Sequence, residues 1–224
     1  MLLKISFALL LIVLLIVCIV GARNFTRMDK AMRVFFTLIL IVFVTEAISF
    51  TLYVQGMSRN TLSHIFSGVE LILVGAYFFH CLPLRKKRFS IIVFSLFALA
   101  LAIGNYIFFQ EKRYNSNMLM AESFIIISMA LIVFFNFLKN DDLSDMVNNP
   151  HFRIWVGLLT LWSSTFFFWA FLLYLQKLHP TYLTWIYLIQ VALNILIYGL
   201  FGYTFYKLSK KNNNPAIEKD MTTN

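Results

Sequence analysis

Long apolar blocks separated by short polar stretches set the pattern of this 224-residue chain. Each block approaches the roughly 20 residues that a helix needs to cross the hydrocarbon core of a bilayer. None of them alternates polar and apolar residues, as the strands of a transmembrane barrel do. The pattern therefore predicts an all-α, polytopic membrane protein with seven transmembrane helices. The expected spans are 5–22, 33–54, 61–82, 89–109, 118–138, 152–176 and 183–206.

The connections between the blocks are short and contain helix breakers: Gly56, Pro83, Asn115-Ser116-Asn117, Asn148-Asn149-Pro150 and His179-Pro180. We therefore expect a single seven-helix transmembrane domain over residues 1–207, followed by a short, polar, disordered tail over 208–224. The first block resembles a signal peptide, but its apolar run exceeds the usual h-region of about 7–15 residues. We interpret it as the first span.

Composition excludes two broad classes of protein. The chain is 60% hydrophobic and 13% charged, whereas an ordinary soluble domain is roughly 45–50% apolar and about 25% charged. A soluble globular enzyme and a disordered chain are both incompatible with these values. Cys18 and Cys81 lie in or beside apolar blocks and are expected to be small buried thiols, with no disulfide between them.

The formal charge of +9 is carried by the loops. Alternate loops hold fourteen Lys and Arg residues on one side of the predicted membrane and five on the other. By the positive-inside rule, the N-terminus is expected outside and the C-terminus in the cytoplasm, across a bacterial inner membrane. Membrane lipids are the expected partners, and the basic run 84–88 is expected near anionic headgroups. Since the basic residues form no single face, we expect no nucleic-acid partner.

Ionisable groups inside spans are costly, so each is a candidate for a functional site. Three carboxylates qualify, and most of the polar groups within the spans lie towards the predicted outer side. Together they predict an outward-facing polar pocket for a small molecule. Hydrogen bonding between helices is the alternative role for the amides. The candidate ligand-binding residues are Glu46, His64, Glu70, Glu122, Gln190 and Asn194.

Motifs do not support an enzyme. The chain has no G-x-S-x-G, no H-E-x-x-H and no recognisable Cys–His nucleophile arrangement, so no catalytic residue, metal ligand or cofactor is assigned. His151 is interpreted as a loop residue without a partner. Two alternatives to a receptor stay open. One is a small-solute or proton-coupled transporter, and the other is a metal-dependent intramembrane hydrolase acting on lipid.

Segments 44–48 (VTEAI), 62–66 (LSHIF) and 69–71 (VEL) carry a resemblance to known proteins. With them, the chain resembles small seven-helix membrane proteins of bacteria, which are similar to the membrane sensor regions of histidine kinases. The resemblance implies signalling, and it implies a separate partner because the chain has no kinase domain. We therefore expect a receptor or sensor-like module that responds to a ligand from the outer side. Its signal would pass to a cytoplasmic or membrane partner, which the segment 139–151 with Asp141, Asp142 and Asp145 is placed to contact.

Overall fold

A computed structural model describes residues 2–84, 86–109, 115–140, 149–175 and 180–211 of the chain. All regular secondary structure in these ranges is helical, and seven helices are long and apolar enough to cross a membrane. This confirms the all-α, seven-helix prediction. The long helices are α1 (Leu2–Asn24), α2 (Lys30–Val54), α3 (Asn60–Cys81), α4 (Lys87–Gly104), α5 (Ser116–Asn140), α6 (Pro150–Leu175) and α7 (Pro180–Lys211). Asp141, Asp142 and Asp145 lie outside the described residues.

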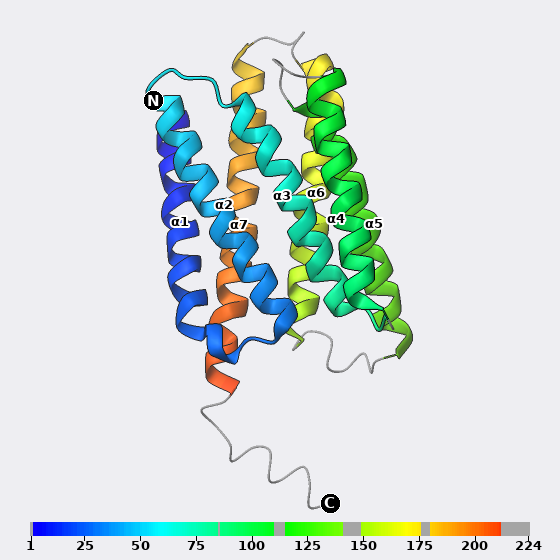
Figure 1. Cartoon of the computed structure of the whole chain (residues 1–224). Helices are drawn as coiled ribbons and strands as arrows, with labels where there is room; N and C mark the ends of the chain where they lie inside the picture. The colour runs from blue at the N-terminus through cyan, green and yellow to red at the C-terminus, as the bar shows by residue number, and fades with distance from the viewer. Residues whose placement is uncertain (1, 85, 110–114, 141–148, 176–179, 212–224) are drawn as a thin grey trace, which may run out of the picture.

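The helices run side by side and alternate in direction (Figure 1). Helix α1 packs against α2 and α7, α2 against α3, α3 against α5, α5 against α6, and α6 against α7. These six helices therefore form a closed ring. Below, the end at which α1 begins is called the N-terminal end of the bundle, and the end at which α7 finishes is called the C-terminal end.

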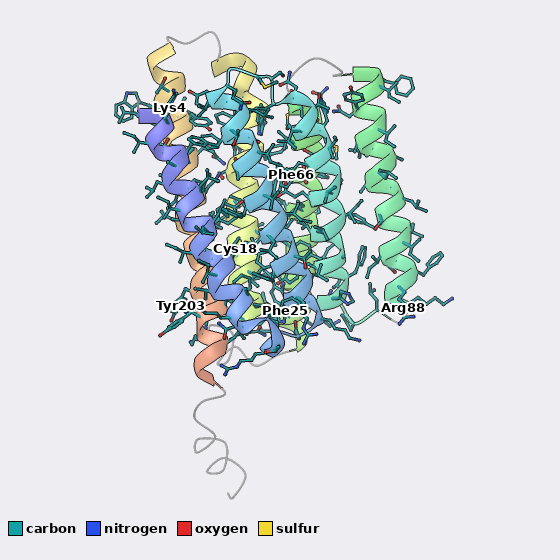
Figure 2. The ribbon with its side chains drawn as sticks, turned by 60° about the vertical axis from the view of Figure 1, so that its left-hand side comes forward. Lys4, Cys18, Phe25, Phe66, Arg88 and Tyr203 are labelled. Carbon is teal, nitrogen blue, oxygen red and sulfur yellow. The ribbon has the colours of Figure 1, made fainter. Side chains whose placement is uncertain are left out.

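Helix α4 lies outside this ring. Its main neighbour is α3, and Figure 2 shows it, with Arg88 near its start, standing to one side of the bundle. Two glycines of α3 allow the approach, because a side chain at Gly75 would collide with the Phe94 ring and one at Gly68 would lie 3.1 Å from the Ala102 methyl. Most other α4 side chains are exposed and apolar, which suits contact with lipid. Helix α4 continues directly into a π-helical segment, η2 (Asn105–Phe109).

Aromatic side chains fill the C-terminal half of the ring. Phe35 of α2 is fully buried, with ring centroids 5.1 Å from Tyr77, 4.9 Å from Phe201 and 6.2 Å from Phe205. These contacts join α2, α3 and α7. This half is packed with aromatic rings. The buried carboxylates lie outside it, towards the N-terminal end of the bundle.

Candidate functional site

The structure brings the three candidate carboxylates together from three helices. Glu70 on α3 lies within electrostatic range of Glu46 on α2 and of Glu122 on α5. Glu122 is fully buried and Glu70 is 8% exposed, whereas Glu46 is half-buried. We call these residues the carboxylate cluster. Arg59, just before α3, interacts electrostatically with Glu46.

Helical periodicity explains why these side chains point inwards. On α3 the buried residues recur every three or four positions, and on α5 they do the same. Glu70 and Glu122 therefore each share a stripe with apolar core residues and point into the bundle. The buried stripes are His64, Ser67, Glu70, Leu71, Val74, Tyr77 and Phe78 on α3, and Met118, Glu122, Ser123, Ile126, Ala130 and Val133 on α5.

A hydrogen-bonded network lies beside the cluster. The Asn115 amide donates to the Ser67 hydroxyl at 2.8 Å and to the Ser63 carbonyl at 3.3 Å, and it accepts from the Asn105 amide at 2.8 Å. The network joins α3, η2 and the residue before α5. Short π-helical segments often occur at functional sites, and Asn105 is the first residue of this one. The sequence identified Asn115 only as a helix breaker. Its partners Ser63 and Ser67 are 52 and 48 residues away, so no local pattern connects them.

Several buried polar atoms in this half have no hydrogen-bond partner among the described residues. They are both carboxylate oxygens of Glu122, Nε2 of His64 and Oδ1 of Asn194. The Ser67 hydroxyl lies close enough to Glu122 to interact with it, but in this arrangement it donates to the Ser63 carbonyl at 3.0 Å. A buried polar group without a partner is costly. Such atoms are therefore suited to receive a proton or a ligand.

Helix α7 contributes residues of two kinds. Gln190 donates to the hydroxyls of Ser164 at 3.3 Å and Thr165 at 3.2 Å, so it joins α7 to α6. This matches the alternative role as a link between helices. Tyr198, two turns further along, is buried and within electrostatic range of Glu70 and Glu46. Tyr198 therefore lies beside the carboxylate cluster, whereas Gln190 is bonded to Ser164 and Thr165.

A second polar cluster lies at the C-terminal end of the bundle. Nε2 of His151 lies 2.9 Å from Oδ2 of Asp29, and its Nδ1 lies 3.4 Å from the Tyr77 hydroxyl and 3.8 Å from Sγ of Cys81. The interpretation of His151 as a loop residue without a partner was wrong. The approach of this ring to Cys81 has no sequence motif, because the two residues come from different helices.

Local sequence explains how His151 reaches this place. Asn149 and Pro150 were interpreted as breakers, but together they start α6: the Asn149 side chain accepts from the His151 amide at 2.9 Å, and proline suits the first turn. Asp29 likewise caps α2 by accepting from the Met32 amide at 2.7 Å. Partial burial raises the pKa of Asp29, but hydrogen bonds from His151 and from the Met32 amide outweigh burial, so the pKa lies below its ordinary value.

Neither a metal site in the described part of the chain nor a similar protein of known function was found that would assign a function to these residues. Among the described residues, no group of three or more His, Cys, Asp or Glu side chains is placed to hold a metal ion. No protein-family model, curated protein or solved structure matches this chain. The resemblance to bacterial sensor regions therefore stays a prediction. The carboxylate cluster and the cluster around His151 are the features from which a function can be inferred.

Proposed function

We propose that this chain is a membrane receptor or sensor-like module in which the carboxylate cluster binds a small cationic ligand. One observation carries the proposal. Glu122 is fully buried, both of its carboxylate oxygens lack a partner, and a second carboxylate, Glu70, lies within electrostatic range. Two neighbouring carboxyl groups in a poorly solvated site favour a bound cation or proton over an empty, doubly ionised state.

The ligand is proposed to arrive from the outer side of a bacterial inner membrane, which the distribution of Lys and Arg assigns to the N-terminal end of the bundle. His64 and Tyr106 lie at the same end, with ring centroids 5.2 Å apart. A cysteine introduced at Lys4 should react with a membrane-impermeant maleimide in intact cells, and one at Arg88 should not. The reverse pattern would overturn the orientation.

The structure also suggests how binding would be transmitted. Helix α3 carries Glu70 and Ser67, and it is the main neighbour of α4. The Asn115 network ties the same part of α3 to Asn105, where α4 turns into a π-helix. A cation drawn between Glu70 and Glu122 would therefore bear on α3 and, through it, on the position of α4. A membrane or cytoplasmic partner would respond to the change in the position of α4.

The test is a thermal-shift screen of small cations on the purified protein in nanodiscs, starting with putrescine, choline and tetramethylammonium. A ligand at about 100 times its Kd stabilises the folded state by about 2.7 kcal/mol. Glu70→Gln and Glu122→Gln should lose the shift, because they remove the charges that bind the cation. Asp29→Asn should keep the shift, because it neutralises a carboxylate in the other cluster. Equal shifts in all four proteins would contradict the proposal.

A second candidate is proton-coupled transport of a small solute. It is favoured by the order of the carboxylates, since Glu70 lies within electrostatic range of both Glu46 and Glu122 and would connect them as a relay. Proteoliposomes loaded with a pH-sensitive dye distinguish the two functions. Proton flux that depends on an added solute and disappears in Glu70→Gln would place transport ahead of sensing.

A further inference from the structure

The second cluster has the order of groups that an activated thiol requires. Sγ of Cys81 lies 3.8 Å from Nδ1 of His151, and Nε2 of the same ring lies 2.9 Å from Oδ2 of Asp29. An ionised carboxylate only accepts hydrogen bonds, so Nε2 carries a proton, and Nδ1 is the ring nitrogen that faces the thiol and the Tyr77 hydroxyl. A nucleophile, a base and a group that orients the base therefore follow one another, as in enzymes that use a covalent intermediate.

The imidazole of His151 is held firmly in this position. The Met32 amide fixes Asp29 from one side. The Trp155 ring stacks beside the imidazole with centroids 6.2 Å apart, and the Tyr77 ring lies 6.1 Å away. The three reacting residues come from the end of α3, the start of α6 and the cap of α2. Their meeting is therefore a product of the tertiary fold.

The surroundings of the thiol indicate what it would react with. Cys81 is a free, partly exposed cysteine and the last residue of α3, at the proposed boundary between membrane and cytoplasm. Lys86 and Arg88 are exposed just beyond it, and Phe89 is 65% exposed. A substrate that keeps an acyl chain in the bilayer and an anionic head in water would fit this boundary. Long-chain acyl-coenzyme A has both parts, joined by a thioester.

We propose that Cys81 is a nucleophilic thiol that accepts a fatty acyl group from a long-chain acyl thioester, with His151 as its base and Asp29 as the residue that positions the base. His151 takes the thiol proton as the sulfur attacks the carbonyl carbon. A bond forms between that carbon and Sγ, and the bond to the coenzyme A sulfur breaks. The proton held by His151 then passes to the departing thiolate. The products are an acyl-Cys81 thioester and free coenzyme A, with no change in oxidation state.

Other titratable groups near the thiol set the controls. Tyr77 on α3 competes for the same imidazole nitrogen at 3.4 Å, and His80 interacts electrostatically with Asp29. Tyr77→Phe removes the competing hydroxyl, so it should keep or increase the rate of acylation. Cys18, the other cysteine, is buried within α1 and is replaced by serine in the test, so that Cys81 is the one thiol left. The carboxylate cluster lies towards the opposite end of the bundle, so this proposal rests on the proposed orientation but not on the proposed ligand.

The experiment incubates the purified full chain in detergent with palmitoyl-coenzyme A and follows the intact mass. With Cys18→Ser as background, one palmitoyl group should add at pH 7, be released by hydroxylamine and be absent in Cys81→Ser. An unassisted thiol is only a few per cent ionised at pH 7, so His151→Gln should slow acylation by about tenfold, and the rates should converge at high pH. Asp29→Asn, which keeps the cap of α2, should give an intermediate rate.

Two results would overturn the proposal. One is the absence of an acyl group on Cys81 in the wild type. The other is an equal rate in the wild type and His151→Gln at pH 7, because it would show that the thiol reacts without its base. An unfolding midpoint measured on each variant separates loss of the base from loss of the fold, and Asp29→Asn gives a second reading if His151→Gln does not fold.

Discussion

Replacing Glu122 with methionine is expected to stabilise the protein. Glu122 is fully buried, and neither of its carboxylate oxygens has a hydrogen-bond partner. A buried polar group left unpaired costs about 1–3 kcal/mol, and methionine fills a similar volume without that cost. For a chain of this length, 1 kcal/mol shifts the unfolding midpoint by about 2–4 °C. Glu122→Met should therefore unfold about 2–12 °C above the wild type.

Tryptophan fluorescence in dodecylmaltoside can measure this shift, since Trp155 and Trp162 are buried in the bundle. Ile126→Met is the matched control. Ile126 lies one turn further along α5 and is equally buried, and a volume-conserving apolar exchange should cost less than about 1.5 kcal/mol. A lower midpoint for Glu122→Met than for this control would refute the reasoning. It would mean that the Glu122 carboxyl group is stabilised where it lies, and the case for a ligand site at Glu122 would fall with it.

Three further predictions concern other parts of the bundle. Asn115→Ala removes three hydrogen bonds at about 0.6 kcal/mol each within a membrane, so the free energy of unfolding should fall by about 2 kcal/mol in the same assay. Asp29→Asn should destabilise the protein at neutral pH. Because the pKa of Asp29 is lower in the folded state, its contribution is complete above the ordinary value of 3.8 and disappears as the pH falls through the lower folded value, so the two midpoints should converge in strong acid. Gly75→Leu would drive a side chain into Phe94, and hydrogen exchange should become faster in α4 while the midpoint falls by an amount equivalent to about 1–3 kcal/mol.

The sequence allowed the helices to be predicted because each apolar block is long enough to span a bilayer, and this signal is local. It also identified Glu46, Glu70 and Glu122, since a carboxylate in an apolar block is conspicuous wherever the helix packs. Their mutual approach could not be predicted, because it depends on which helices are neighbours. The α4 block is about as long as the others, and its mean hydropathy of 2.3 lies within their range of 1.5–3.2, so nothing in the pattern shows that α4 lies outside the ring.

The second cluster was missed for a different reason. Asn149 and Pro150 are typical both of a helix break and of a helix start. The interpretation as a break placed His151 in a loop. Asp29 and Cys81 lie far from it in the sequence, so no spacing rule connects the three residues. Interpreting Asn149 as an N-cap would have predicted His151 in the first turn of α6. It would not have predicted that Asp29 and Cys81 lie beside it.

The peripheral place of α4 has a consequence for how the bundle comes apart. Each helix of the closed ring is held by a neighbour on both sides, so removing any one of them breaks two interfaces. Helix α4 has one main neighbour, and its departure leaves the ring closed. Local opening costs least where few contacts are lost. Helix α4 should therefore dock last during assembly in the bilayer and detach first under force, as a cooperative unit of its own.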